Sequence, residues 1–384
     1  MTGAPPPGDG RRKVVMLLSN PATHDPRPLK EARALARSGY QVTILAWDRE
    51  GETRLDSVME GGVVVKRWRL HAGHGTPIRT VPKLFLFYAW CVVQVISMSV
   101  DVVHCHDVDT LPAGFASKAF KLGRTKMVYD MHDLPEAFLR FFPFASAMQK
   151  GFLRGVRRHA DLLVSASEGY TGYLRRAGLK MKRAVVVLNA PSLKEGREPR
   201  KPSDAFNVVY YGALEEERGV KLLVDAIKNR PGVTLTLAGR GALAKWVEQA
   251  AENSDNIRFL GWLNLDDLDE AVREAHLLPS FYAPTSTNIL LSTPGKLLKS
   301  FSLSIPAVVT NGTHQAELVA RFGCGLAVPW GKPEDIGAAV TSLAGDRMGY
   351  ERMTRLAFAA FQGELNWETM ETRLIRAYSE MVGR

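Results

Sequence analysis

The chain has 384 residues, of which 46% are apolar, which is enough for two domains that each bury a core of ordinary size. Its three scattered cysteines, Cys91, Cys105 and Cys324, exclude a disulfide framework and a zinc-binding spacing, and they favour a reducing cytoplasm. The net charge of +10 is uneven, because residues 1–200 carry +13, from 31 Lys and Arg against 18 Asp and Glu, and the remainder carries −3.

The first half of the chain alternates β-branched runs with helical segments. Such alternation is typical of a doubly wound parallel sheet. A polar, proline-rich segment at 191–204, after a strand at 184–190, predicts an interdomain linker. The other elements predicted in this half are a flexible tail at 1–12, a helix at 28–40, and strands at 13–20, 41–48, 63–70, 101–107 and 126–133.

The same rhythm restarts after the linker, with strand-like runs at 207–214, 233–241, 256–262 and 307–312 and helices between them. We therefore expect an α/β fold of two Rossmann-like, doubly wound parallel sheets that face a central cleft. The expected domains are 13–190 and 205–365, followed by a helix at 366–384 for which packing back on the first domain is one option. Ligands of such sheets bind beyond the carboxyl ends of the strands.

Two apolar segments bear on membrane contact. The 16 residues at 85–100 fall short of the roughly 20 that a spanning helix needs, so they predict a buried helix under the first sheet. Residues 137–159 mix aromatic and basic side chains as an interfacial segment does, and a core helix with solvated charges is the alternative. The side chains in question are Phe138, Phe141, Phe142, Phe144 and Phe152, with Arg140, Lys150, Arg154, Arg157 and Arg158.

Histidines and carboxylates follow the strand VVHCH. Because side chains alternate along a strand, His104 and His106 share one side of it. We interpret His104 as a core histidine and His106, which opens the polar stretch with Asp107, as functional. The pair shows no further ligands at a metal-like spacing, so no metal site is predicted.

The next strand along the chain ends in a similar way, in VYDMHDLPE. It contributes His132, Asp133 and Glu136, so two adjacent strand ends predict one polar wall. An imidazole there can donate a hydrogen bond to a hydroxyl or a phosphate, and a carboxylate can accept one or take a proton.

Two glycine turns follow strands in the second half. YYGALEEERGV turns at Gly212 and begins a helix near Arg218, where free N–H groups and the helix dipole favour a diphosphate. LAGRG, with Gly239, is a second turn at which the backbone can approach a ligand closely.

Five segments, taken in chain order, resemble the family 4 retaining glycosyltransferases over about residues 13–380: DVVHCHDVDTLPAG, VYDMHDLPE, YYGALEEERGVKLL, TPGKLLKSFSLSIPAVVTN and GCGLAVPWGKPEDIGAAVTSLAGD. The resemblance implies the GT-B fold of two Rossmann-like domains. It also implies that a nucleotide-sugar binds mainly on the second domain, and that the sugar is transferred with retained configuration and without a metal or other cofactor.

The resemblance also implies roles for single residues. His106 matches the family's histidine near the donor sugar, and Arg218 matches the basic residue before the glycine of the phosphate-binding turn. Lys296 matches a position near the nucleotide, and Glu317 matches the glutamate of a GGxxE-like loop. The full set of candidates comprises catalytic His106, Asp107 and His132, donor-binding Gly212, Arg218, Gly239, Lys296, Lys299 and Glu317, and acceptor-side Asp25, Arg27, Asp133 and Glu136.

Three departures separate the chain from the family pattern. Leu291 and Lys299 stand where two glutamates eight positions apart are common, so ribose recognition must differ. Ala213 stands where an arginine often follows the phosphate-turn glycine. The first glycine-rich loop is replaced by NPATHDPRPLKEA, in which Asp25 and Arg27 are candidates to face the acceptor or the donor phosphate.

These observations predict a cytoplasmic, metal-independent glycosyltransferase that moves a sugar from a nucleoside diphosphate to a hydroxyl acceptor, with fixed cations stabilising the leaving diphosphate. The basic first half favours a lipid-linked acceptor or glycan precursor at the inner face of a membrane, with a soluble small molecule close behind. The alternatives are a GT-B scaffold that has lost catalysis and binds a partner, which Lys299 and Ala213 favour, and a sugar-nucleotide epimerase. Nucleic acid is not expected as a partner, because no nucleic-acid-binding motif accompanies the charge.

Overall fold

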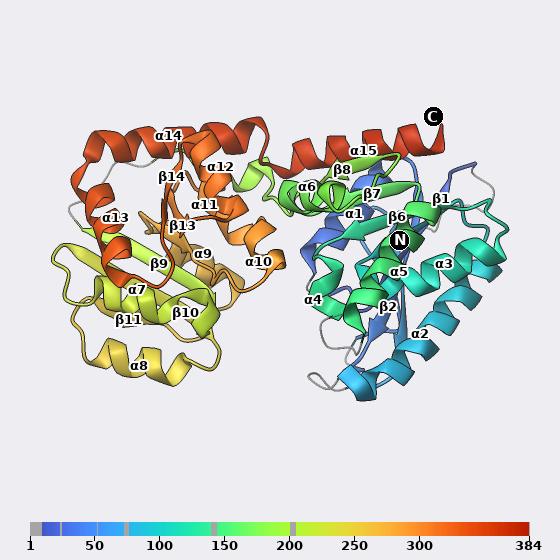
Figure 1. Ribbon diagram of the computed structural model, residues 1–384, viewed down its shortest axis with the longest axis horizontal. Helices are drawn as coiled ribbons and strands as arrows, with labels where there is room; N and C mark the ends of the chain where they lie inside the picture. Colours follow the sequence, from blue (N-terminus) through green and yellow to red (C-terminus); the bar gives the residue numbers. More distant parts are fainter. Residues whose placement is uncertain are drawn as a thin grey trace. The chain divides into compact units, whose positions relative to one another are not determined.

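The computed structural model describes residues 10–23, 25–51, 53–72, 77–139, 144–199 and 205–383. The chain forms two compact units, an N-terminal unit of Met1–Val187 with Glu371–Arg384 and a C-terminal unit of Leu188–Met370 (Figure 1). Several residues named above lie outside the described part of the chain: 1–9 of the predicted tail, 200–204 of the predicted linker, and Arg140, Phe141 and Phe142.

The N-terminal unit is built on one sheet of eight strands in the order β3-β4-β2-β1-β5-β6-β7-β8. All neighbours are parallel except β3 and β4. The central strand, KVVMLL, is buried from its second residue to its last, as expected of a parallel strand covered on both faces. The strands are β1 (Lys13–Leu18), β2 (Gln41–Asp48), β3 (Asp56–Val58), β4 (Val64–Arg69), β5 (Val102–His106), β6 (Lys126–Met131), β7 (Leu162–Ser165) and β8 (Ala184–Val186).

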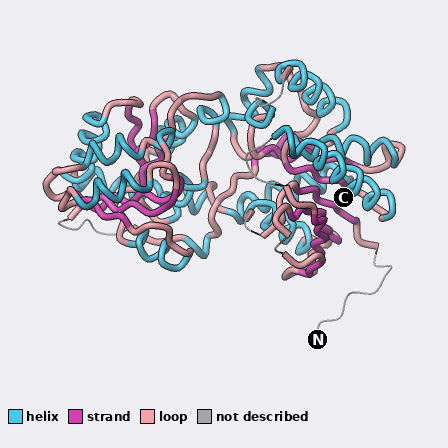
Figure 2. Tube along the Cα trace, turned by 90° about the horizontal axis from the view of Figure 1, so that it is seen from below, coloured by secondary structure: helices cyan, strands magenta, loops and turns pink. Residues whose placement is uncertain are grey.

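Helices flank the strands of this unit (Figure 2). The last of them, α15, begins in the C-terminal unit and joins this one from Glu371 onward. It docks because Leu374, Tyr378 and Met381 recur at helical spacing and are all buried. The helices are α1 (Pro26–Arg37), α2 (Pro77–Ser97), α3 (Leu111–Phe120), α4 (Pro135–Leu139), α5 (Ala145–His159), α6 (Glu168–Arg176) and α15 (Trp367–Val382), with a 3-10 turn η1 (Val108–Thr110).

The apolar segment at 85–100 corrects one expectation. It is a helix, α2, but only one side of it is buried, through Leu84, Phe87, Cys91 and Val95. The opposite side is exposed and equally apolar, so the prediction of a buried helix was wrong for that side. The reason is that a helix apolar all round carries no periodicity to show which side meets water.

The C-terminal unit holds two three-stranded parallel ladders, β11-β10-β9 and β12-β13-β14. A single parallel bridge between Val208 and Leu277 joins them, so β9 lies beside β12. The prediction of two parallel-sheet domains is therefore confirmed. The strands are β9 (Phe206–Ala213), β10 (Val233–Arg240), β11 (Ile257–Phe259), β12 (Leu278–Ser280), β13 (Ala307–Thr310) and β14 (Gly325–Val328).

The described part of the predicted linker packs on the C-terminal unit. The backbone N–H of Arg197 donates to the carbonyl of Ser302 at 2.8 Å, and Gly196 lies against the ring of Phe361. The boundary between the units therefore falls before this segment, at Val187–Leu188. The helices of this unit are α7 (Val220–Ile227), α8 (Ala244–Glu252), α9 (Leu265–Arg273), α10 (Thr287–Leu291), α11 (Gly295–Ser302), α12 (His314–Phe322), α13 (Pro333–Gly345) and α14 (Arg347–Gly363), with 3-10 turns η2 (Leu193–Glu195) and η3 (Glu216–Arg218).

Candidate functional site

The carboxyl ends of β5 and β6 form the predicted polar wall of the N-terminal unit. His106 ends β5 and lies opposite Asp130 of β6 in the strand register, and His132 follows β6. Nδ1 of His106 lies 3.1 Å from Oδ2 of Asp130 and 3.1 Å from Nε2 of His132. The same Asp130 oxygen lies 3.2 Å from Nε2 of His132. With Asp107, these residues form what we call the His–Asp cluster.

Asp107 fixes the loop that follows β5. Its φ of 60° is in a region that residues other than glycine rarely adopt, and such strain is concentrated at functional sites. One carboxylate oxygen accepts the backbone N–H of His132 at 3.0 Å, and the other lies 3.4 Å from Nδ1 of that histidine. Asp107 therefore orients His132 from the side opposite to Asp130.

Asp130 is completely buried and is paired with Arg27 of α1. The guanidinium contacts both carboxylate oxygens, at 3.2 and 2.5 Å, and also donates to the carbonyl of Val187. Its Nε lies 3.2 Å from Glu31, one turn along α1. Arg27 is only 3% exposed. The idea that Arg27 faces a ligand is therefore corrected, because its cation is used inside the unit to hold Asp130.

The cluster holds its two histidines in different charge states. Burial and the neighbouring His104 keep the pKa of His106 well below its ordinary value. Burial alone would also lower the pKa of His132, but the carboxylates of Asp107 and Asp130 outweigh it and raise that pKa to about 10. His132 is the more accessible of the two, with a side chain 18% exposed against 3% for His106. The wall thus presents an imidazolium backed by a neutral imidazole.

Three polar residues behind this wall were not predicted: Asp130, Glu31 and Tyr378. A charged residue inside a strand of buried apolar neighbours was the available signal for Asp130, because buried carboxylates are rarely unpaired. The interpretation of His104 as a core histidine is confirmed, since it is fully buried and its Nδ1 lies 2.6 Å from the hydroxyl of Tyr378.

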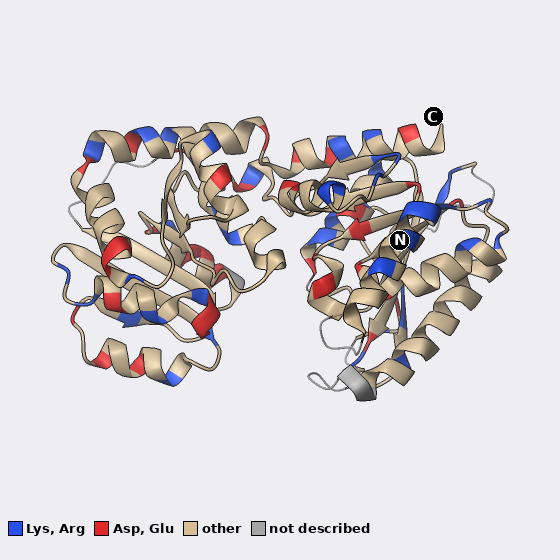
Figure 3. Ribbon diagram, viewed as in Figure 1, with Lys and Arg blue, Asp and Glu red and all other residues tan. Residues whose placement is uncertain are grey.

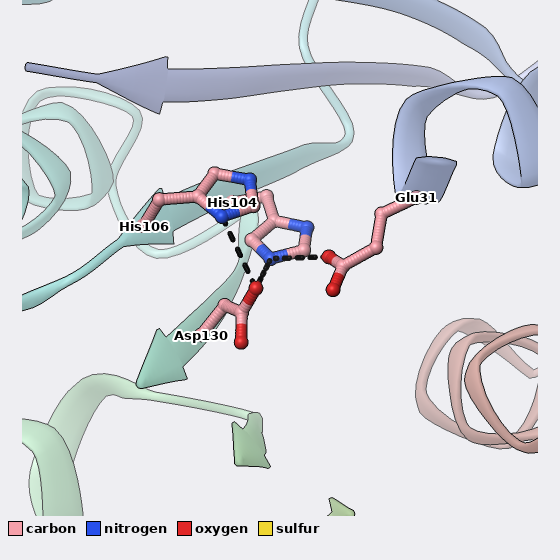
Figure 4. A group of neighbouring side chains, drawn as sticks. All are labelled: Glu31, His104, His106 and Asp130. Atoms are coloured by element: carbon pink, nitrogen blue, oxygen red, sulfur yellow. Dashed lines mark ion pairs between the residues drawn. The ribbon is translucent and has the colours of Figure 1, made fainter. Parts of the chain in front are cut away.

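Glu31, His104, His106 and Asp130 could together hold a metal ion by spacing alone, since one ligand atom from each lies within 4.8 Å of all the others (Figure 4). The charges do not fit such an ion. The guanidinium of Arg27 already occupies Asp130 and lies against Glu31, so a divalent cation would have to enter beside a buried cation. We therefore assign the group to an internal polar network.

The proposed acceptor-side carboxylates lie near the same edge. Asp133 is exposed and accepts from the hydroxyl of Tyr170 at 3.4 Å. Glu136 is half-buried and accepts from the hydroxyl of Tyr173 at 3.4 Å. Asp25 is half-buried before α1 and accepts from the side chain of Asn20 at 3.0 Å. Their role toward an acceptor stays a prediction.

In the C-terminal unit, the two predicted glycine turns lie side by side at the carboxyl ends of β9 and β10. Gly212 and Gly239 are opposite each other in the strand register and both have positive φ. A Cβ on Gly239 would lie 1.9 Å from the carbonyl oxygen of Gly212, so no side chain fits there. A Cβ on Gly212 would lie 3.7 Å from Nζ of Lys296, which brings that lysine to the turn.

Two cations, which we call the cationic pair, lie in this part of the unit: Lys296 at the Gly212 turn and Arg218 at the end of η3. Nζ of Lys296 lies 3.7 Å from the ring centre of Tyr210, and the guanidinium of Arg218 lies 4.4 Å from that of Tyr282. Neither forms an ion pair with a carboxylate of the described residues. Burial, with a smaller contribution from Arg218, lowers the pKa of Lys296 to about 7. Two cations held close together without a counter-ion form a site suited to an anion.

The other two donor-side candidates are already paired. Lys299 lies 3.5 Å from Glu195 and 3.4 Å from Asp269, so its charge is neutralised within the unit. Glu317 is largely exposed in the first turn of α12 and contacts Nδ1 of His314 at 2.8 Å. The structure thus brings Gly212, Gly239 and the cationic pair together, and it gives Lys299 carboxylate partners.

Replacing His132 with Gln is expected to make the free energy of unfolding fall less steeply as the pH rises from 6 to 10. Because folding raises the pKa of His132 from 6.5 to about 10, its contribution is complete below pH 6.5 and is lost as the pH rises toward 10. Lys296 acts in the opposite sense, so the quantity to measure is the difference in free energy of unfolding between wild type and His132→Gln, by urea titration from pH 6 to 10. A difference that does not shrink with rising pH would contradict the charge assigned to His132.

Two family descriptions match the chain in succession. "Glycosyl transferase 4-like domain" matches residues 26–190, and "Glycosyl transferases group 1" matches residues 205–346. Together they cover most of the sequence and correspond to the two structural units.

Individual proteins similar to this chain are also glycosyltransferases or glycan synthases, at sequence identities below 30%. The glycogen synthase of Mycobacterium tuberculosis is 27% identical over 191 residues, which cover 47% of this chain and 44% of the relative, so the match spans less than half the length of that relative. The chitobiosyldiphosphodolichol beta-mannosyltransferase of Yarrowia lipolytica is 23% identical over 83% of this chain and 76% of its own. The structure of Anabaena HepE in complex with UDP-glucose aligns over 96% of this chain and 99% of its own, with a TM-score of 0.71 and 17% identity. With both family descriptions matched in order and the two parallel-sheet units in place, the chain belongs to the family 4 retaining glycosyltransferases, which have the GT-B fold.

Proposed function

We propose that the chain transfers a sugar, with retained anomeric configuration, from a uridine diphosphate sugar to a hydroxyl acceptor. The observation that carries the proposal is the cationic pair beside the Gly212 turn, which lacks an acidic partner among the described residues. A diphosphate supplies the missing negative charge, and the glycine lets its oxygens approach the backbone. Uridine is chosen because the similar HepE structure holds UDP-glucose.

In the proposed reaction, the bond between the anomeric carbon and the diphosphate oxygen breaks while a bond from that carbon to the acceptor oxygen forms on the same face. The acceptor proton passes to the departing diphosphate. Arg218 and Lys296 stabilise the charge that develops on the leaving group, which is the largest electrostatic demand of the step. His106 and His132 are assigned to the hydroxyls of the transferring sugar, as hydrogen-bond partners.

For the acceptor, we propose a hydroxyl on a lipid-linked glycan or glycan precursor, used at the cytoplasmic face of a membrane. Two observations support this choice. The first 200 residues carry a net charge of +13, which suits an anionic lipid surface. The Yarrowia relative is named for transfer to a diphosphodolichol-linked sugar.

The test is UDP release from a panel of UDP-sugars, with GDP- and ADP-sugars as comparison, by the full chain and by His106→Ala and His132→Ala. We expect the wild type to release UDP from at least one UDP-sugar. We expect each variant to be slower by roughly 100-fold or more, with little change in UDP affinity by calorimetry. Absence of both UDP binding and UDP release would contradict the proposal.

One observation favours a second candidate, a GT-B protein that binds a nucleotide-sugar without turning it over. Lys299 stands where the family commonly has a glutamate, and it is held by Glu195 and Asp269. In that case calorimetry would show UDP binding, while no donor in the panel would release UDP, with or without added acceptors.

A further inference from the structure

The outer side of α2 forms an apolar surface that the proposed reaction does not use. Two exposed apolar side chains at the end of α3 continue it, because Nζ of Lys121 donates to the carbonyls of Ile96 and Met98 and so holds this turn against the end of α2. We call the combined surface the apolar face. Its members, with exposed fractions, are Phe85 (64%), Leu86 (56%), Val93 (60%), Ile96 (45%), Phe120 (66%) and Leu122 (82%).

This clustering is larger than scattered surface hydrophobics produce. Thirteen large apolar side chains are exposed among the described residues, and six of them lie on the apolar face. A contiguous exposed apolar patch on a folded unit marks a site at which the unit contacts another protein or a membrane. Within the described residues, the window Thr80–Ser97 is also long and apolar enough to cross a membrane by length and composition alone, with 22% of it buried.

Basic side chains outnumber acidic ones around the apolar face, where Asp161 pairs with Lys118 and Lys126. The three segments 80–100, 111–126 and 145–159, which contain most of α2 and all of α3 and α5, hold nine Lys and Arg and no Asp or Glu. Helix α3 packs against both of the others, since it contacts α2 and its Lys118 donates to the carbonyl of His159 at the end of α5. In Figure 3, α2 is tan over most of its length, with Lys and Arg on the neighbouring elements. The basic side chains exposed on α5 are Lys150, Arg154, Arg157 and Arg158.

We infer that the apolar face docks on an anionic lipid bilayer, with α2 lying in the interface rather than crossing it. A crossing is disfavoured because Phe87, Cys91 and Val95 on the inner side of α2 are fully buried in the unit, with the ring of Phe87 stacked 5.5 Å from that of Trp47. An apolar surface bordered by cations is what an interfacial element presents to acidic lipid headgroups.

The charge also argues against a second copy of the chain as the partner. A twofold dimer places the same patch on both sides of the interface, so the exposed cations of α5, Lys150, Arg154, Arg157 and Arg158, would approach the same cations of the other copy. The inference rests on the proposed function in one respect: membrane docking would bring the protein to its lipid-linked acceptor. Lipid binding itself can be measured without turnover, so its failure is distinguishable from failure of the UDP-sugar reaction.

The first test is sedimentation of the full chain with vesicles of phosphatidylcholine alone or with 30% phosphatidylglycerol. We expect binding to the acidic vesicles that weakens with added salt. Phe85→Ser and Val93→Ser are each expected to weaken it roughly tenfold or more, because each removes a large apolar side chain from the lipid. The matched control is Val58→Ser, an apolar position on β3 of the same unit that is even more exposed, at 74%, and this variant should bind like wild type.

The second test separates charge from apolar contact. The double variant Arg154→Glu, Arg157→Glu should lose the preference for acidic vesicles, whereas Lys245→Glu, Arg258→Glu in the C-terminal unit, with the same change of charge, should keep it. Wild-type binding by Phe85→Ser and Val93→Ser, or no binding of wild type to acidic vesicles, would overturn the inference. So would a lipid-free dimer, seen by analytical ultracentrifugation, that Phe85→Ser dissociates.

Discussion

Replacing Asp130 with Asn is expected to lower the free energy of unfolding by about 3–5 kcal/mol at pH 7, because it leaves a buried arginine without its main counter-ion. Arg27 is 3% exposed and Asp130 is fully buried, so water cannot replace the lost carboxylate. Although burial alone would raise the pKa of Asp130, Arg27 and His132 hold it well below its ordinary value of 3.8. The carboxylate is therefore ionised at neutral pH, and urea titration of both proteins measures what that charge contributes.

Glu31→Gln is the matched control, because Glu31 is a second buried carboxyl group against the same arginine. Its pKa is raised well above the ordinary value, by burial first and then by Asp130, which favours the neutral carboxylic acid. Glutamine resembles that neutral form, and we expect a loss under about 1 kcal/mol. Equal losses for the two variants would contradict the charges assigned here. The contribution of Asp130 is present above about pH 4 and is lost on acidification, so the wild type and Asp130→Asn should converge in acid.

The fold was largely predictable because strands buried on both faces are continuous apolar runs. KVVMLL and QVTILAWD carry this signal over six and eight residues and are β1 and β2. Strands β3 and β7 were not predicted, because they are only three and four residues long and give too short an apolar run. Strand β3 is also polar and lies at the edge of the sheet. The two sides of α2 could not be told apart either, because both are apolar and burial depends on what packs against each side.

The candidate site was predictable only where the chemistry follows a strand end. His106 and His132 stand at such positions and the structure brings them together. Predicting Asp130 as a site residue requires the strand register, because only the pairing of β5 with β6 shows that Asp130 lies opposite His106. Its partner Arg27 is 103 positions away in the sequence, on a helix whose packing no local pattern reports. Long-range ion pairs of this kind are set by tertiary packing, which the sequence alone does not reveal.

Replacing Lys296 with Met is expected to weaken UDP binding by about 10- to 100-fold, because it removes one of the two cations offered to the diphosphate. The pKa of Lys296 is about 7, so at pH 8 most of the lysine is neutral before the nucleotide arrives. A bound diphosphate raises that pKa, and the lysine takes up a proton on binding. Wild-type affinity should therefore fall as the pH rises from 7 to 9, and calorimetry in buffers of different ionisation enthalpy should detect the proton uptake.

The same substitution should act on stability in the opposite direction. A lysine whose pKa is lowered on folding opposes folding below its ordinary value of 10.5, so Lys296→Met should be as stable as wild type or more stable at pH 7. Lost affinity with undiminished stability separates a binding role from a structural one. Lys245→Met, at an exposed position on α8, is the control and should leave the affinity and the proton uptake unchanged. Wild-type affinity in Lys296→Met, or proton uptake that survives the substitution, would place the diphosphate elsewhere on the unit.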